Sequence, residues 1–388
     1  MNLKILFVTC FDSPGGQSNR SYLFAKEFYK IGYNVTYFTN RYNHLDDHKR
    51  SIRKLKLDNN IKHIFVDNKN FKNKKIVSVI LNCLSLFKFL RKNKFDIIIS
   101  SSVPLINSFF ALIAKKKETK FFFDLRDVWP DALFDTGQIS RLNPIYIILK
   151  IMQIIIYKNS YGLISALPNT SDYVKKYNKH LPQIYVPNGY KPYPKHKKKF
   201  NKNILRIMYV GRFNQNHDVK IILQCAKYFL HKKKINNILF DIYGYGDNLS
   251  YIKEYIFKNR LINVKLKGKV QKKKIYSLSK KYDLALATIT NAKSFQFGIN
   301  LNKIYEYFNS SMPVIFSGNV PFNPVRQANC GYICKNFSFI NLSKKILKFN
   351  KLNNNEKRKL STNAKNFFDK KYNLKLQTAK IDKFLSKC

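Results

Sequence analysis

Short apolar stretches alternate with amphipathic helical stretches along this chain of 388 residues, and the alternation starts a second time near its middle. The first series includes expected strands at residues 3–8 and 120–124, and the second begins with an expected strand at 205–210. Strands separated by helices are typical of parallel α/β sheets. The sequence therefore predicts two successive doubly wound domains, in which ligands bind near the carboxyl ends of the strands.

The segment 191–203, KPYPKHKKKFNKN, separates the two series because it contains prolines and a charge run and has no apolar periodicity. We therefore expect an N-terminal domain at residues 1–190, a linker at 191–203 and a C-terminal domain at 204–365. Further strands are expected at 34–39, 61–66, 95–100, 162–165, 238–243, 264–266, 283–287 and 314–316. Helices are expected at 17–31, 75–92, 105–115, 143–157, 219–232 and 272–280 and over much of 342–387.

The formal charge is +50, from 72 basic and 22 acidic residues, and codon composition alone does not account for so large an imbalance. Such a field implies anionic partners: nucleic acid, an anionic membrane face or phosphorylated substrates. No nucleic-acid-binding motif is present, and the lysines are spread along the chain, which favours the last two. No apolar run reaches the ~18–20 residues of a membrane-spanning helix.

The six cysteines are scattered, and the closest pair, Cys330 and Cys334, has no histidine nearby. This pattern does not indicate a zinc site, and it favours reduced thiols in a cytoplasmic protein. The apolar run at the N-terminus is short and lacks a basic leader, so we expect a strand there and not a signal segment.

The segment 297–316, FGINLNKIYEYFNSSMPVIF, carries the most specific functional pattern. A loop leads into a short helix whose first turns hold Asn302, Lys303 and Glu306, and the last two share a helix face. The free N–H groups of a helix N-terminus and a lysine suit phosphate, and a carboxylate suits the two hydroxyls of a ribose. The pattern therefore predicts a nucleotide-diphosphate site. The alternative is an ordinary amphipathic unit with a surface Lys–Glu pair.

Three other segments follow expected strands. Gly15 and Gly16 would let backbone N–H groups approach a ligand, or would form a simple turn. In the segment 124–131, DLRDVWPD, three carboxylates (Asp124, Asp127 and Asp131) and Arg126 suit a hydroxyl-rich ligand, because carboxylates accept hydroxyl hydrogen bonds, and the indole of Trp129 can cover an apolar sugar face. The alternative for this segment is a capped loop with local salt bridges.

The last two motifs come from the second half of the chain. Arg212 ends the expected strand that opens this half, where a guanidinium could clamp a phosphate. Gly244 lies in a glycine-rich turn that could approach a nucleotide base or could serve only as a tight turn.

In this order, the segments PGGQSNR, DLRDVWPDAL, PNGY, VGRFN, IYGYG, DLALA and NKIYEY resemble those of the GT-B glycosyltransferases. They are similar in particular to retaining family 4, in the branch that builds bacterial surface polysaccharides and includes amino-sugar transferases. The resemblance covers nearly the whole chain. It implies two Rossmann-like doubly wound α/β domains facing a central cleft, with a C-terminal helix at 366–388 that crosses back to the N-terminal domain.

The resemblance also implies roles for single residues. Glu306 matches the glutamate that binds the nucleotide ribose, and Arg212 matches the arginine at the donor diphosphate. Asp127 falls near a histidine that contacts the donor, while Gly15 and Gly16 match the loop beside the diphosphate and acceptor. The remaining expected substrate-binding residues are Arg126, Trp129, Asn188 of PNGY, Gly244, Asn300 and Asn302.

Two departures from the family pattern affect this assignment. The first of the family's two glutamates would fall on Gly298, which leaves the contacts to the donor sugar open. The family's lysine shortly after the arginine is absent from residues 215–218, and Lys303 is a candidate to replace its charge.

The implied activity is transfer of a hexosyl or N-acetylhexosaminyl group from a nucleotide sugar, expected to be UDP-linked. The expected acceptor is a lipid-linked oligosaccharide at the inner face of the cytoplasmic membrane, in lipopolysaccharide or capsule synthesis. No metal or other cofactor is expected, because Arg, Lys and helix N-termini offset the charge of the leaving diphosphate. The alternatives are a GT-B sugar-nucleotide epimerase and a non-catalytic basic protein that binds nucleic acid, although no specific nucleic-acid partner is expected.

Overall fold

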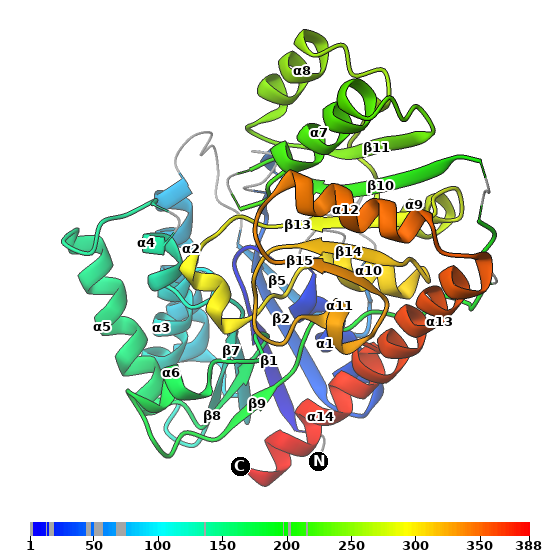
Figure 1. Ribbon diagram of the computed structural model, residues 1–388. Helices are drawn as coiled ribbons and strands as arrows, with labels where there is room; N and C mark the ends of the chain where they lie inside the picture. Colours follow the sequence, from blue (N-terminus) through cyan, green and yellow to red (C-terminus); the bar gives the residue numbers. More distant parts are fainter. Residues whose placement is uncertain are drawn as a thin grey trace. The chain divides into compact units, whose positions relative to one another are not determined.

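In the computed structural model the chain forms two compact units (Figure 1). Unit 1 comprises Met1–Tyr190 and Leu374–Cys388, and unit 2 comprises Lys191–Asn373. The structure describes residues 3–12, 14, 19–43, 48–49, 57–66, 75–135, 137–196, 198–200, 203–214 and 216–388. Within these ranges no helix is both long and apolar enough to cross a membrane.

Unit 1 contains a seven-stranded parallel sheet in the order β5-β2-β1-β6-β7-β8-β9. Its strands are β1 (Lys4–Val8), β2 (Asn34–Asn40), β5 (Lys62–Val66), β6 (Ile97–Ser101), β7 (Lys120–Leu125), β8 (Gly162–Ser165) and β9 (Gln183–Tyr185). Two very short strands, β3 (Tyr42–Asn43) and β4 (His48–Lys49), pair separately. The helices are α1 (Arg20–Lys30), α2 (Lys75–Lys92), α3 (Leu105–Ala114), α4 (Asp131–Asp135), α5 (Pro144–Asn159), α6 (Ser171–Lys175) and α14 (Leu374–Lys387).

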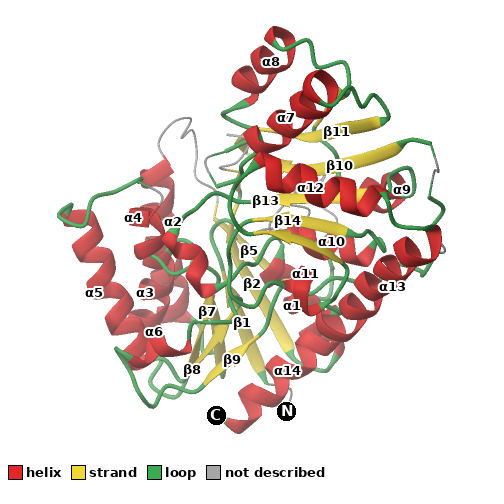
Figure 2. Cartoon of the chain, in the orientation of Figure 1, coloured by secondary structure: helices red, strands yellow, loops and turns green. Residues whose placement is uncertain are grey.

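Both faces of this sheet are covered, which is why its central strands are apolar throughout and not alternating. On one face, residues such as Leu6 and Ile98 pack against α2, α3 and α5. On the other face, residues such as Phe7 and Ile97 pack against α1 and α14. Figure 2 shows these helices in red around the yellow strands.

Unit 2 contains a six-stranded parallel sheet in the order β12-β11-β10-β13-β14-β15. Its strands are β10 (Leu205–Arg212), β11 (Ile238–Tyr245), β12 (Val264–Gly268), β13 (Leu284–Thr288), β14 (Val314–Ser317) and β15 (Gly331–Cys334). Its helices are α7 (Lys220–Lys227), η2 (Tyr228–Lys232), α8 (Leu249–Lys258), α9 (Lys272–Ser279), η3 (Lys293–Phe297), α10 (Asn302–Asn309), α11 (Pro324–Gln327), α12 (Phe339–Asn350) and α13 (Asn354–Lys371).

Local sequence signals set several helix starts. Asn143 caps α5 by accepting a hydrogen bond from the backbone N–H of Ile145, and Pro144 occupies the first helical position. At α13, Asn353 and Glu356 form a reciprocal capping box.

The chain passes from unit 2 back to unit 1 between α13 and α14. The tail expected to start at residue 366 begins inside α13, which continues to Lys371. Leu374 then opens α14, and its backbone N–H donates to the carbonyl of Tyr190 at 3.0 Å, so the chain re-enters unit 1 beside the residue where it left. Leu374, Ile381 and Leu385 join the core of unit 1.

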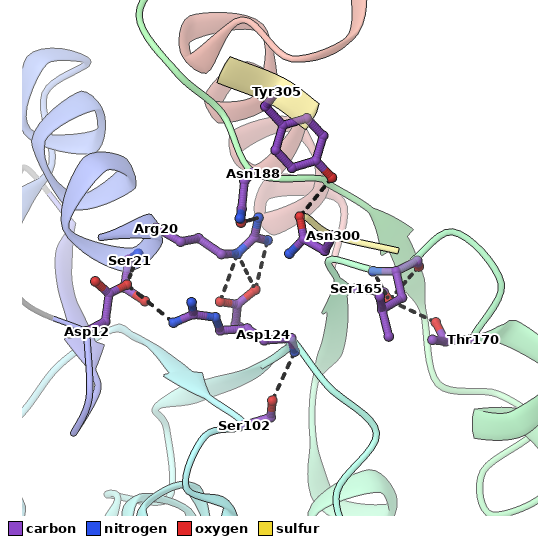
Figure 3. A network of polar contacts seen from close by, with 12 residues as sticks. Asp12, Arg20, Ser21, Ser102, Asp124, Ser165, Thr170, Asn188, Asn300 and Tyr305 are labelled. Carbon is purple, nitrogen blue, oxygen red and sulfur yellow. Dashed lines mark hydrogen bonds and ion pairs between the residues drawn. The ribbon is translucent and has the colours of Figure 1, made fainter. Parts of the chain in front are cut away.

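A buried ion pair ties α1 to β7 in unit 1 (Figure 3). The guanidinium of Arg20 donates from Nε to both carboxylate oxygens of Asp124 at 3.1 Å and from Nη2 to Oδ1 at 2.9 Å. Its Nη1 donates to Asn188 Oδ1 at 3.3 Å. Asp124, which the sequence places in a ligand-facing segment, is therefore committed to the interior of the unit.

We expect Asp124→Asn to destabilise the protein by ~3–5 kcal/mol, because it leaves the buried Arg20 guanidinium without its counter-charge. Urea denaturation measures the loss of stability in Asp124→Asn. The same measurement on Arg20→Met, on Asp124→Leu and on the double variant that combines them tests whether the two side chains depend on each other. The double variant should lose much less stability than the sum of the singles, because it leaves no buried charge behind. Additive losses would show that the two side chains contribute independently.

Candidate functional site

The order of strands in unit 2 reverses at β10, which pairs with β11 on one side and with β13 on the other. Parallel α/β sheets bind ligands outside the carboxyl ends of the strands at such a point. Arg212 is the last residue of β10, and the chain that leaves β13 runs through η3 to the N-terminus of α10. The carboxyl edge of this sheet is therefore the candidate site.

Lys303, in the first turn of α10, is buried with 9% of its surface exposed. Its Nζ donates to the hydroxyl of Tyr209 at 3.0 Å and lies 4.4 Å from the centre of that ring. Among the described residues, no carboxylate lies within 4.0 Å of this ammonium. Burial lowers the pKa of Lys303 to about 7, so the positive charge is costly in the absence of an anion.

Glu306, one turn later on α10, is also buried, with 7% of its surface exposed. Its Oε1 lies 3.9 Å from Lys272 Nζ on α9, whereas its Oε2 has no hydrogen-bond partner among the described groups. Burial raises the pKa of Glu306 to about 7, and the charge of Lys272 opposes this shift only in part. The alternative of a surface Lys–Glu pair is therefore wrong, because both side chains lie in the interior.

Close backbone packing makes room for Lys303 at the end of β10. A Cβ atom on Gly211 would lie 2.6 Å from Lys303 Nζ, and a Cβ atom on Gly244 would lie 2.0 Å from the Gly211 carbonyl oxygen. Gly246 has φ +144° and would place a Cβ atom 2.4 Å from the carbonyl oxygen of Phe213. The glycines at the ends of β10 and β11 thus have a packing role, whatever else approaches them.

Arg212 lies at the same edge and is partly exposed. Its ion pair with the exposed Asp247 is long, at 3.8 Å from Nη2 to Oδ1. Its guanidinium lies 5.8 Å from the centre of the Tyr245 ring. These weak contacts leave the guanidinium able to reorient toward an anion.

His217 belongs to the same neighbourhood, although sequence reasoning did not select it. Burial and the charge of Lys303 lower its pKa to about 3, so the imidazole is neutral at physiological pH. Its Nδ1 has no hydrogen-bond partner among the described groups. The sequence feature that could have identified His217 is its position in the loop that follows β10.

The two asparagines expected at this site lie before and at the start of α10. Asn300 Oδ1 accepts a hydrogen bond from the hydroxyl of Tyr305 at 2.9 Å (Figure 3). Asn302 is the first residue of α10 and is partly exposed.

The residues expected in unit 1 have different environments. Gly15 and Gly16 lie outside the described residues. Asn188 is buried and hydrogen-bonded to Arg20, so its visible role is structural. Asp127 lies two residues beyond the end of β7, and the residue is exposed at the surface. Desolvation of its carboxylate nevertheless raises its pKa, and the nearby charge of Arg126 opposes this shift only in part.

Arg126 and Trp129 flank Asp127 and are both partly buried. Arg126 donates from Nη1 to Asp12 Oδ2 at 3.4 Å, and its backbone N–H donates to Ser102 Oγ at 2.9 Å. The carbonyl of Trp129 accepts from Gln153 Nε2 at 2.6 Å, and its ring packs on the core under α5. These contacts fix the loop and hold Asp127 at its outer end.

Asp131 anchors the far end of this loop. Its carboxylate accepts hydrogen bonds from Tyr146, Lys150 and Tyr173. These donors outweigh desolvation and lower the pKa of Asp131. The ion pair with Lys150 Nζ, at 3.0 Å, thus joins the end of this loop to α5.

Comparison with known proteins shows which sequences and folds this chain resembles. The family described as "Glycosyl transferases group 1" matches residues 193–367, nearly all of unit 2. No curated protein sequence matches the chain. Sucrose-phosphate synthase from Thermosynechococcus elongatus is similar in structure, with a TM-score of 0.77 at 11% identity over 100% of this chain and 99% of that one. HepE of Anabaena, solved with UDP and glucose, has a TM-score of 0.71 at 13% identity over 100% of both chains.

The chain has the GT-B fold. A third similar structure is WaaG, a glycosyltransferase involved in lipopolysaccharide biosynthesis, with a TM-score of 0.68 at 15% identity over 98% of this chain and 99% of that one. The expected fold class is thus confirmed, and the match to the glycosyl transferase group 1 family covers residues 193–367 of unit 2. In the described parts of the chain, no three His, Cys, Asp or Glu side chains gather as metal ligands would.

We expect Lys303→Met to stabilise the protein by ~2–4 kcal/mol at pH 7 and below, because it removes a buried charge. Lys303 titrates at about 7 in the folded protein and ordinarily at 10.5. Between these values the unfolded chain binds more protons, so the wild type gains stability as pH rises. The advantage of the variant should therefore fade toward pH 10.5 in denaturation series.

The exposed Lys258→Met on α8 is the matched control, and it should change neither stability nor its pH dependence. A gain in stability from Lys303→Met that stays constant between pH 7 and pH 10.5 would contradict the lowered pKa of Lys303.

Proposed function

We propose that this protein is a glycosyltransferase that takes its sugar from a UDP-linked donor. The observation that carries the proposal is the pair at the head of α10: among the described residues, the buried ammonium of Lys303 has no counter-charge and one oxygen of the buried Glu306 carboxylate has no partner. A nucleoside diphosphate offers the complement of both groups. Further support comes from HepE of Anabaena, a similar structure that was solved with UDP and glucose.

The diphosphate would lie against Lys303, with Arg212 swinging onto its outer oxygens. A buried ammonium interacts strongly with an anion because little water screens it. The N-terminus of α10 adds N–H groups and a partial positive charge. Because Lys303 has a pKa of about 7 without an anion, binding the diphosphate would draw a proton onto it near neutral pH.

The ribose hydroxyls would donate to Glu306. Its Oε2 has no donor among the described groups, and a buried acceptor without a donor is costly. Two vicinal hydroxyls would satisfy both carboxylate oxygens and favour the ionised form. Diphosphate and ribose would thus contact one helix face, one turn apart.

In the transfer step, the bond between the anomeric carbon and the β-phosphate oxygen breaks, and the acceptor hydroxyl oxygen bonds to the anomeric carbon. The hydroxyl proton leaves to the diphosphate or to solvent. Arg212 and Lys303 stabilise the charge that grows on the leaving diphosphate, a role that needs no metal. We place Asp127 at the sugar and assign the reaction to the retaining class, by resemblance.

We further propose that the acceptor is a lipid-linked saccharide and that unit 1 docks on an anionic membrane. The similar structure WaaG, involved in lipopolysaccharide biosynthesis, supports such an acceptor. On α5, Tyr146, Ile156 and Tyr157 face the core, whereas Ile148 and Ile151 remain 52% and 53% exposed. Ile148 and Ile151 lie among other exposed apolar residues of α5 and of the segment just before it. We call this set the apolar surface of α5; it comprises Leu142, Ile145, Ile147, Ile148 and Ile151.

Exposed apolar residues continue on the neighbouring helices. Helix α3 packs against both α2 and α5, and Ile80, Leu84 and Ile113 on α2 and α3 are also exposed. Exposed apolar residues on a protein of charge +50 fit an anionic leaflet, because charge attracts the protein and apolar side chains then insert.

Transfer of labelled sugar from UDP-hexoses and UDP-N-acetylhexosamines to lipid-linked saccharides tests the activity. We expect a lipid-linked product and, for Glu306→Gln, donor binding ten- to hundredfold weaker, which is the ~1.5–3 kcal/mol of a charged hydrogen bond. The exposed Glu254→Gln is the matched control. A donor epimerised without any acceptor would favour the epimerase, and unchanged donor affinity of Glu306→Gln would refute the ribose assignment.

Vesicle sedimentation tests the membrane proposal. The wild type should sediment with anionic vesicles at low salt, dissociate at high salt and bind neutral vesicles little. The Ile148→Ser, Ile151→Ser double variant should bind anionic vesicles roughly thirtyfold more weakly, since the two half-buried isoleucines contribute about 1 kcal/mol each.

The control removes exposed apolar surface from unit 2 instead, at the strongly exposed Phe257 and Ile262, both changed to Ser. Equal losses in the two double variants would contradict docking through α5. Retention of the wild type on neutral vesicles at high salt would contradict the electrostatic part.

A further inference from the structure

Unit 2 contains a second cationic site, at the opposite edge of its sheet from Lys303. A pocket with about 200 Å³ of room is formed by the segment around Lys195, the start of α13 and the turn at Ser311. Ser311 lies just before β14, so the pocket is at the amino ends of the parallel strands. The candidate site is at their carboxyl ends, and α10 runs between the two edges.

Cations outnumber carboxylates around this pocket. Lys195, Lys198, Arg358 and Lys365 line it. Asp369 neutralises part of this charge, because Lys365 Nζ donates to its Oδ1 at 2.6 Å.

The remaining charges near the pocket come from neighbouring elements. Asp283, just before β13, partly offsets the charge of Lys198, whereas Lys280 at the end of α9 adds positive charge beside His196. Among the described residues, four lining cations thus lie near two carboxylates.

Several buried nitrogen atoms here lack hydrogen-bond partners among the described groups. They are Nε of Arg358 and both ring nitrogens of His196. Lys198, itself buried, donates to the carbonyl of Ser279 at 2.8 Å and contacts the Met312 sulfur, and neither group carries a negative charge. Buried donors left unpaired are costly, so the pocket favours a ligand that accepts several hydrogen bonds.

The basic groups of the pocket also disfavour one another's charged forms. Burial lowers the pKa of Lys198 to about 7, and Asp283 opposes the shift only in part. Burial and the charges of Lys198 and Lys280 lower the pKa of His196. A bound anion would reverse both effects.

We infer that this pocket binds a small soluble anion that carries a phosphate group, such as inorganic phosphate or a phosphomonoester. A tetrahedral dianion accepts hydrogen bonds from several directions, which matches donors that come from the linker and from α13. The pocket is smaller than the ~300–1,000 Å³ of sites for larger ligands. Its lining is polar, and no exposed large apolar residue belongs to it, which disfavours a lipid phosphate.

Calorimetric titration of the full chain with inorganic phosphate tests the inference. The titration is carried out in the Lys303→Met background, so that the site at the head of α10 does not contribute. We expect one phosphate per chain, and we expect Arg358→Gln to weaken its binding at least tenfold. His196→Gln should weaken it also, and this variant keeps the test valid if Arg358→Gln folds poorly.

Arg326→Gln is the matched control, because it removes one arginine charge from the exposed end of α11, outside the pocket, and should bind phosphate as the parent does. Equal affinity in the parent, Arg358→Gln and His196→Gln would overturn the inference. So would equal weakening by Arg326→Gln, since it would indicate a general charge effect. Selective loss of binding to phosphatidic acid vesicles in Arg358→Gln would overturn the assignment to a soluble anion.

Discussion

The burial of α10 is the constraint on which the rest of unit 2 depends. Every residue from Lys303 to Asn309 is buried, so this short helix has no solvent face. The hydroxyl of Tyr307 accepts from the backbone N–H of Val210 on β10 at 2.7 Å, and Asn309 hydrogen-bonds to the chain at Lys191 and Tyr193. Helix, central strand and linker are thus fixed together, and the charged groups at the helix head cannot turn outward to water.

The fold could be predicted from the sequence because the central strands are continuous apolar runs. Helix α2 lies where its periodicity placed it, at Lys75–Lys92, and α5 differs by one or two residues at its ends. The expected elements did not include β9, β15 and α8. The strands β9 and β15 are only three and four residues long, so they carry little apolar pattern, whereas α8 is largely exposed.

The candidate site was less predictable, because its properties come from distant packing. Sequence spacing placed Lys303 and Glu306 on one helix face, but their burial depends on residues such as Tyr209, 94 positions away. Asn188 is the opposite case. Its motif predicts contact with a ligand, whereas its side chain accepts a hydrogen bond from Arg20, 168 positions earlier. In a chain with 72 basic residues, the presence of a lysine carries little information, and it is burial that makes Lys303 a candidate site residue.

The hydrogen bond between Leu374 and Tyr190 has a consequence for how this chain can be altered. Unit 2 is one uninterrupted segment, inserted into unit 1 at a single spot where the two flanking residues touch. Neighbouring termini are the condition under which inserted domains are tolerated and exchanged. The segment from Lys191 to Asn373 can therefore be treated as a cassette, replaceable by the corresponding half of a relative while unit 1, with α14, keeps its own core.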